Sequence, residues 1–256
     1  MRIKQVSLYN YRGYREVTTI DFNDLTVFVG RNDIGKSTVL EALDLFFNDG
    51  RGIVRFDKAD INISSNDNSY KITVVFSELP PKVVIDALYE TSLQEEYLLN
   101  AEGDFEVRKI FNGNKCTNTA IRAYHPTNSL CANLHKKKKS ELKAIIAKEG
   151  IECANQNINA VMRKAIWNAY QDNLQLEEID LDVNAGEDTK RIWEKLSNVM
   201  PVYSLFQADR QNSDSDKEVQ DPLKLAVAQF FQDEELQKTL TAVAEQVELR
   251  LKEVDS

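Results

Sequence analysis

The alternation of hydrophobic and polar residues predicts a series of short strands along this chain. Apolar and β-branched residues either alternate with polar ones or form short runs bounded by turn residues, a pattern typical of strands. The dipeptide Asn112-Gly113 separates two of these segments and favours a tight antiparallel hairpin. The expected strands are residues 3–8, 17–22, 25–29, 70–76, 105–111, 115–124 and 202–206.

Helical spacing, with apolar residues three and four positions apart, predicts several of the segments between these strands. The first helix is expected at residues 36–47 and should end at Asn48-Asp49-Gly50, because glycine readily adopts the conformation that follows a helix. An acidic stretch at residues 173–188 predicts a loop. The remaining helices are expected at residues 83–99, at residues 140–170 in two pieces split near Gly150, and at residues 189–200.

The last part of the chain, from Pro222 onward, also has helical spacing. Its apolar residues recur at alternating three- and four-residue steps, which suits either a packed helix or the first heptads of a coiled coil. The run covers only about two to three heptads, so both alternatives stay open. The residues in question are Leu236, Leu240, Val243, Val247, Leu251 and Val254.

Residues 30–37, with the sequence GRNDIGKS, fit the pattern G-x-x-x-x-G-K-[ST] of a phosphate-binding P-loop. An expected strand before the pattern and an expected helix after it supply the context that makes this signal specific. Backbone N–H groups of the loop and the positive end of the helix would face the phosphates. Lys36 would reach the β- and γ-phosphates, and the hydroxyl of Ser37 would hold Mg²⁺. The expected cradle is Gly30, Asn32, Asp33, Gly35, Lys36, Ser37 and Thr38.

Composition places the chain among soluble globular proteins. Of its 256 residues, 42% are hydrophobic and 29% are charged, and its length suits one large domain or two small ones. No apolar run approaches the roughly 20 residues that span a bilayer, and the N-terminus lacks the apolar core of a signal peptide. We therefore expect a cytoplasmic protein with no membrane partner. The net charge of −9 argues against binding nucleic acid over the whole surface.

Two local patterns have a functional and a structural interpretation. The run at residues 136–139 consists of four lysines and could bind an anion, but a solvated helix start is the favoured interpretation. Cys116, His125, Cys131 and His135 are residue types that bind zinc. Their spacing matches no compact pair of ligands, so ordinary thiols and imidazoles are favoured.

Three segments resemble parts of a known superfamily. They are VSLYNYRGY at residues 6–14, DLTVFVGRNDIGKSTVLEALDLFF at residues 24–47, and VYSLFQADRQNSDSDKEVQDPLKLAV at residues 202–227. Together they are similar to the N-terminal half of an ABC-type ATPase head of the RecF/SMC/OLD superfamily, and the third resembles OLD-like ATPases in particular. The resemblance implies an α/β P-loop NTPase fold, with an ABC-ATPase-type N-terminal lobe, a mixed sheet, an antiparallel β layer and a helical arm at the C-terminal end.

The resemblance also implies regions and residue roles. Arg12 would reach the nucleotide phosphates, and Gln207, as a Q-loop residue, would contact Mg²⁺ and the attacking water, which places it with Lys36 in catalysis. Asp33 stands where the superfamily commonly has glycine, although aspartate tolerates positive φ better than most residues. The implied regions are a P-loop ATPase core with an antiparallel layer (1–135), a helical insertion (136–200), a return strand with the Q-loop (201–221), and the start of the arm (222–256).

The sequence lacks two motifs that an ATPase head needs. It has no LSGG-like signature and no apolar run ending in Asp-Glu that would serve as Walker B. In the resembling superfamily both lie in a C-terminal lobe beyond the arm, so the chain is interpreted as an N-terminal half, truncated or part of a split enzyme.

The expected function is the ATP-binding head region of a DNA-processing or phage-defence ATPase/nuclease system. It would use ATP and Mg²⁺ and turn nucleotide over slowly or not at all alone. A second copy, a C-terminal half or a partner nuclease would complete it, and DNA would be contacted through the assembly. The alternative is a nucleotide-dependent binding or assembly module whose chemistry lies in a partner protein. A nucleoside kinase has no support, because no lid-like arginine cluster follows the P-loop.

Overall fold

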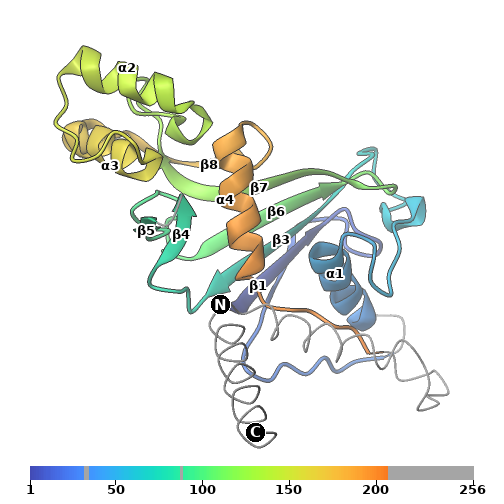
Figure 1. The fold of residues 1–256 in the computed structure, drawn as a ribbon. Coiled ribbons are helices and arrows are strands. Elements are labelled where there is room, and N and C mark those ends of the chain that lie inside the picture. The colour runs from blue at the N-terminus through green and yellow to red at the C-terminus, as the bar shows by residue number, and fades with distance from the viewer. Residues whose placement is uncertain (32–34, 87–88, 207–256) are drawn as a thin grey trace, which may run out of the picture. The chain divides into compact units, whose positions relative to one another are not determined.

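An antiparallel sheet is the central element of the computed structural model, which describes residues 1–31, 35–86 and 89–206 (Figure 1). Within those residues its six strands follow the order β2-β1-β3-β6-β7-β8, and β4 pairs with β5 in a separate hairpin. The sheet strands are β1 (Arg2–Tyr9), β2 (Thr18–Asp21), β3 (Tyr70–Ser77), β6 (Phe105–Phe111), β7 (Cys116–Pro126) and β8 (Leu176–Asp182). The hairpin strands are β4 (Val83–Asp86) and β5 (Tyr89–Thr91).

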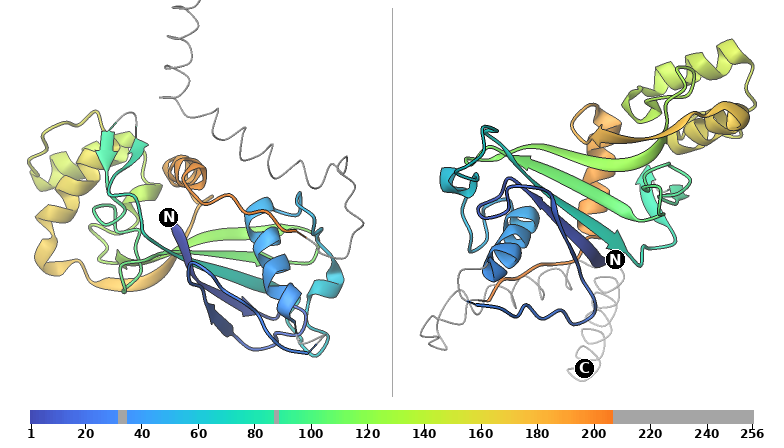
Figure 2. Two further views of the ribbon diagram at one scale, coloured as in Figure 1. Left: turned by 90° about the horizontal axis from the view of Figure 1, so that it is seen from below. Right: turned by 180° about the vertical axis from the view of Figure 1, so that it is seen from behind.

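Helices cover one face and one end of this sheet. The α-helices of the described residues are α1 (Lys36–Asn48), α2 (Lys139–Glu149), α3 (Asn159–Ala169) and α4 (Glu187–Asn198), and the 3-10 helices are η1 (Lys58–Asp60), η2 (Leu134–Lys136) and η3 (Gln171–Asn173). Helices α1 and α4 lie on the same face of the sheet, whereas α2 and α3 lie beyond one end of it (Figure 2). All of these elements belong to one compact unit, Met1–Tyr203. The α/β fold class is confirmed, but the expected mixed sheet is not found, because all strand pairs of the sheet in the described residues are antiparallel.

Helix α1 packs on the sheet through aromatic side chains. The rings of Phe46 and Phe47 lie 6.4 and 6.1 Å from the ring of Phe76 on β3. Alternate residues of the central strands point toward this helix and are fully buried: Val6, Leu8, Ile72, Val74, Phe105 and Val107. Each such side chain contributes about 1.5–3 kcal/mol on burial, so the packing fixes the helix that begins at the P-loop.

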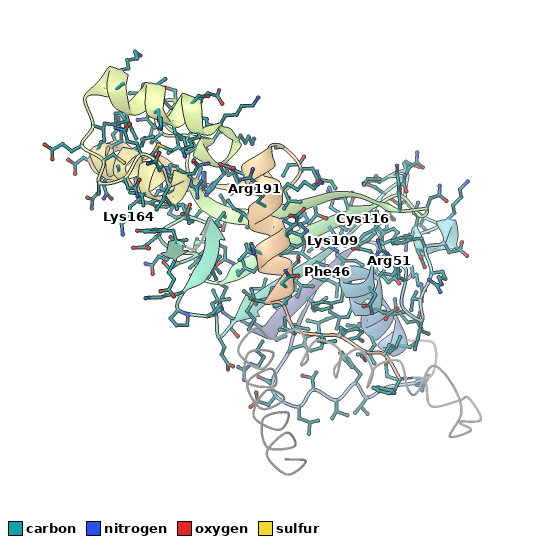
Figure 3. The ribbon with its side chains drawn as sticks, in the orientation of Figure 1. Phe46, Arg51, Lys109, Cys116, Lys164 and Arg191 are labelled. Atoms are coloured by element: carbon teal, nitrogen blue, oxygen red, sulfur yellow. The ribbon has the colours of Figure 1, made fainter. Side chains whose placement is uncertain are left out.

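A buried lysine on the same face holds the end of α1. Lys109 on β6 donates hydrogen bonds to the carbonyl of Phe46 at 2.8 Å and to the Asp49 carboxylate at 2.7 Å (Figure 3). Its ammonium also lies 5.2 Å from the centre of the Phe46 ring. A cation at this end of a helix satisfies carbonyls that have no partner within the helix. The sheet therefore anchors α1 at the end opposite to the P-loop.

The expected hairpin around Asn112-Gly113 is confirmed. Strands β6 and β7 pair antiparallel, with Val107 opposite Ile121. Gly113 has a φ of +80°, and a Cβ at this position would lie 2.9 Å from the Cα of Lys58. Only glycine fits both the backbone conformation and this close approach. The expected strands at residues 3–8, 17–22 and 70–76 and the helices near 36–47, 140–170 and 189–200 are also confirmed.

A second hydrophobic cluster holds together the helical region, which we define as residues 92–100 and 125–174 and which contains α2 and α3. Its buried members include Cys131, Leu134, Leu142, Ile146, Met162, Ile166 and Trp167. The indole of Trp167 donates a hydrogen bond to the carbonyl of Cys131 at 3.0 Å. Because this cluster draws on α2, α3 and the segment before them, these helices have a core of their own next to the sheet.

Two predictions about secondary structure are wrong. Residues 83–99 form the β4–β5 hairpin followed by turns, because the β-branched run Val83-Val84-Ile85 favours extended backbone over a helix. The acidic stretch at residues 173–188 contains strand β8 rather than only a loop. Arginines of β7 and β6 neutralise that strand: Arg122 on β7 contacts Glu178 and Arg108 on β6 contacts Asp180, each at 2.8 Å.

Two further expected strands are absent from the described residues. Residues 25–29, expected as the P-loop strand, form no strand pair within the described chain. The exposed fractions of Leu25, Val27 and Val29 are 82%, 70% and 89%. Residues 202–206 likewise form no strand, and there Tyr203 stacks on Phe47 with ring centres 5.6 Å apart. The predicted helical arm from Pro222 onward lies outside the described residues.

Candidate nucleotide-binding site

The described part of the P-loop leads directly into α1. Gly35 precedes the helix with φ 93° and ψ 17°, the left-handed conformation that suits glycine. A Cβ on Gly35 would lie 3.2 Å from the hydroxyl oxygen of Tyr14. No side chain caps the N-terminus of α1 by a hydrogen bond. The first backbone N–H groups of the helix are therefore available to an anion.

The Lys36 side chain folds back onto the P-loop. Its ammonium donates to the carbonyl of Gly30 at 2.8 Å and to the carbonyl of Arg31. An ammonium has three donors, so one is left for a phosphate oxygen. Ser37 is exposed in the first turn of α1, and Thr38 follows it half-buried. These residues fit a polyphosphate with Mg²⁺, because they combine a cation, free N–H groups and an accessible hydroxyl.

The turn after β1 lies against the P-loop. Tyr11 and Tyr14 exchange backbone hydrogen bonds of 2.9 and 2.8 Å and so close the turn. The hydroxyl of Tyr14 donates to the carbonyl of Gly35 at 3.1 Å, and burial raises the pKa of Tyr14. Tyr11 is fully buried, with its ring centre 5.0 Å from that of Tyr70. The Tyr11 side chain is thus part of the hydrophobic core, whereas the Tyr14 side chain contacts the P-loop.

Arg12 lies at the tip of this turn and connects two carboxylates. Its Nε donates to Asp60 Oδ1 at 2.8 Å, and its Nη1 pairs with Glu41 on α1. Burial acts to lower the pKa of Arg12, but Tyr11 and the hydrogen bonds to Asp60 and Glu41 outweigh it and raise the pKa. Arg12 therefore stays charged and ties the turn to the helix of the P-loop.

The structure brings part of the expected site together. Gly30, Gly35, Lys36, Ser37 and Thr38 meet at the start of α1, and Arg12 joins them through Glu41. Asn32, Asp33 and Gln207 lie outside the described residues, so their expected roles stay predictions.

Sequence reasoning missed the partners of Arg12. Glu41 lies in the block that resembles the superfamily, but no local pattern marked it as a partner of Arg12. Asp60 had no signal at all, because its contact with Arg12 spans 48 residues.

The two histidines lie next to each other, with ring centres 5.3 Å apart, and both rings contact groups of the chain. His135 Nε2 lies 3.0 Å from Glu96 Oε2, and His125 Nδ1 lies 2.8 Å from the carbonyl of Tyr97. Because a carbonyl only accepts, His125 carries its proton on Nδ1. No group of three or more potential ligands that could hold a metal ion occurs among the described residues.

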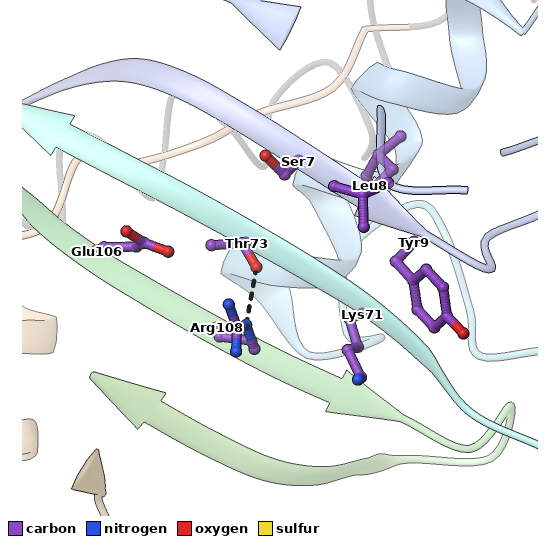
Figure 4. Close-up of a pocket in the computed structure, with 8 residues that line it drawn as sticks. Ser7, Leu8, Tyr9, Lys71, Thr73, Glu106 and Arg108 are labelled. Carbon is purple, nitrogen blue, oxygen red and sulfur yellow. Dashed lines mark hydrogen bonds between the residues drawn. The ribbon is translucent and has the colours of Figure 1, made fainter. Parts of the chain in front are cut away.

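A shallow pocket lies on the sheet face opposite α1 (Figure 4). Its charged lining residues already have partners: Arg108 pairs with Asp180, and the Lys71 ammonium lies 5.1 Å from the centre of the Tyr9 ring. Glu106 is hydrogen-bonded to Asn100 at 3.2 Å. This pocket is separated from the P-loop by the sheet and takes no part in the candidate site.

Comparison with known proteins shows the family of the chain. A family model described as an AAA ATPase domain matches residues 1–256, and no curated protein matches the sequence. None of the helices in the described residues is long and apolar enough to cross a membrane. The family match spans the P-loop at residues 30–37 and shows an ATP-binding ATPase of the P-loop superfamily. The chain belongs to the AAA ATPase domain family.

Proposed function

We propose that this chain is the ATP-Mg²⁺-binding head region of a DNA-processing or phage-defence ATPase/nuclease system, and that a second lobe completes it. The observation that carries the proposal is the start of α1. There Lys36, the uncapped helix N-terminus and the exposed hydroxyl of Ser37 converge beside the turn that holds Arg12. That combination fits the charge and the hydrogen-bonding needs of a nucleoside triphosphate.

Each residue of the site has a defined role in this proposal. Lys36 neutralises charge on the β- and γ-phosphates, the N–H groups of α1 bind phosphate oxygens, and Ser37 supplies a Mg²⁺ ligand. Arg12 adds a further cation near the same helix. Gln207 is proposed to orient water and Mg²⁺. Bound ATP supplies the phosphoanhydride whose cleavage an assembled head would couple to its task.

The need for a second lobe is supported by residues 25–29. This segment is apolar in sequence, yet its side chains Leu25, Val27 and Val29 are largely exposed and its backbone has no strand partner in the described chain. Exposed strand-forming segments with free backbone groups pair readily with another strand. The sequence also lacks the Walker B acid and the signature motif. A partner lobe would supply both a neighbouring strand and those hydrolytic groups.

Titration calorimetry with Mg-ATP tests the site. Lys36→Ala removes the cation that faces the phosphates and should weaken binding at least about tenfold, or 1.4 kcal/mol. Lys148→Ala is the matched control, because Lys148 is an exposed lysine on α2 whose one ion pair among the described residues is with the neighbouring Glu149. Equal affinity for the wild type and Lys36→Ala would refute the site. Tight ATP binding without turnover, even with a second lobe added, would favour the alternative of an assembly module.

A further inference from the structure

Arg12 is held between two carboxylates that differ in burial and in attachment. Asp60 has an exposed side-chain fraction of 3%, whereas that of Glu41 is 21%. We propose that Asp60 is a positioning residue that holds Arg12 beside the phosphate site, and that Glu41 is the partner which Arg12 exchanges for the phosphates of Mg-ATP. This inference rests on the proposed ATP-binding function.

Asp60 is fixed in its place by the surrounding backbone. It ends the 3-10 helix η1, where its carboxylate also accepts the N–H of Asp57 at 3.1 Å in a capping box. The carbonyl of Asp60 accepts the N–H of Arg12 at 2.7 Å, and the Asn62 side chain donates to the carbonyl of Arg12. Backbone and side chain of Arg12 are thus both bound to residues 57–62. A side chain held in this way loses little entropy when its free end binds a ligand.

Glu41 is placed so that a bound phosphate would compete with it. It follows Ser37 by four residues, so the two lie on the same face of α1, about 6 Å apart along the axis. The guanidinium of Arg12 therefore stands close to the expected Mg²⁺ and phosphate position. Its Nη2 has no hydrogen-bond partner among the described residues, and its side chain is 31% exposed.

The charge balance favours an exchange on nucleotide binding. Two carboxylates share one guanidinium, which leaves a net negative charge beside the site where a polyanion binds. A phosphate that takes Nη1 or Nη2 gains a charge-assisted hydrogen bond, while the partly exposed Glu41 can turn to solvent. Buried Asp60 has no such access to water, so it stays bound to Nε.

Mg-ATP titrations of the full chain test the proposal, because substitutions of the two carboxylates should change the Kd in opposite directions. Asp60→Asn releases Arg12 and should raise the Kd about tenfold, whereas Glu41→Gln frees Arg12 and should lower the Kd about threefold. Loss of a negative charge near the phosphates would by itself lower the Kd in both variants. A lowered or unchanged Kd in Asp60→Asn therefore overturns the proposal. A raised Kd in Glu41→Gln overturns the exchange.

Control variants separate positioning from structural damage. Asp57→Ala weakens the same capping box without touching Arg12 and should leave the Kd within about twofold. In an Arg12→Met background, Asp60→Asn should no longer raise the Kd, and a rise that persists there overturns the proposal. Asp60→Glu keeps the charge but displaces the carboxylate, and should raise the Kd about threefold if Asp60→Asn does not fold.

The same titrations distinguish this inference from the function on which it rests. If Lys36→Ala binds Mg-ATP like the wild type, the proposed site itself fails. If Lys36→Ala loses binding while Asp60→Asn keeps it, only the positioning role of Asp60 fails. Circular dichroism melting of each variant shows which titrations were made on folded protein.

Discussion

The P-loop region and the helical region each contain an arginine paired with carboxylates, but the two clusters are built differently. In the helical region, Arg163 Nε donates to Glu96 Oε2 at 2.8 Å, and both side chains are at most 2% exposed. In the P-loop region, Arg12 serves two carboxylates and is 31% exposed. The cluster around Arg163 is closed to water, whereas the cluster around Arg12 keeps access to solvent. This difference separates a structural ion pair from one that can exchange partners.

The largest expected effect is on the stability of the helical region. Arg163→Met leaves the Glu96 carboxylate buried without its main partner, which should lower the free energy of unfolding by about 3–5 kcal/mol. Arg12→Met should cost only about 1–2 kcal/mol, because its partners retain other hydrogen bonds or reach water. Denaturant unfolding of both variants measures the difference. Equal losses would remove the distinction between the two clusters.

Acid should destabilise the helical region because it contains two buried titratable side chains, His125 and Glu96. Burial, together with the neighbouring His135, lowers the pKa of His125 to about 3. Burial alone would raise the pKa of Glu96, but Arg163 and His135 lower it to about 2. Below about pH 6.5, His125 is therefore protonated in the unfolded chain but stays neutral in the native one, so unfolding takes up a proton. The contribution of His125 to the free energy of unfolding should be complete above about pH 6.5 and should be lost as the pH falls toward 3.

His125 alone should account for a loss of about 2–3 kcal/mol between pH 7 and pH 4.5, since each pH unit is worth about 1.4 kcal/mol. Denaturant unfolding at several pH values measures the slope. In His125→Gln the slope over this range should be clearly smaller, because no imidazole takes up a proton on unfolding. An unchanged slope in that variant would show that His125 is not the group responsible.

The smallest expected effect concerns the exposed apolar segment. Val27→Asp should change the stability of the chain by less than about 0.5 kcal/mol, because the Val27 side chain is 70% exposed. The same substitution should abolish pairing with a second lobe, which analytical ultracentrifugation of the mixture would detect. A large loss of stability in the isolated chain would mean that residues 25–29 are already part of a core.

Local patterns in the sequence predicted most of the described fold. The turn signal Asn112-Gly113 and the apolar periodicity of residues 36–47 and 70–76 depend on neighbours along the chain, and they are confirmed. Strand β8 was missed because its acidic residues are neutralised by Arg108 and Arg122 from strands distant in sequence. The helix expected at residues 83–99 failed because short apolar runs do not separate helix from strand.

In the candidate site too, the sequence predicts the residues of a local motif but not the contacts between distant residues. Gly35, Lys36 and Ser37 follow from one contiguous motif, so the sequence alone located them. The contacts of Arg12 with Glu41 and Asp60 join residues 29 and 48 positions apart. Such pairings are set by how β1, α1 and η1 meet in space, which no local pattern encodes. The family match supports the P-loop but does not specify these partners.

A turnover assay with Mg-ATP on the purified 256-residue chain tests the central claim most directly. We expect nucleotide binding that depends on Lys36, together with hydrolysis well below about 1 per second, because the sequence has no Walker B or signature motif that would orient and stabilise the reaction. Adding a second lobe that supplies them should raise the rate. A rate of about 1 per second or faster for the chain alone, lost in Lys36→Ala, would contradict the account and show a complete ATPase.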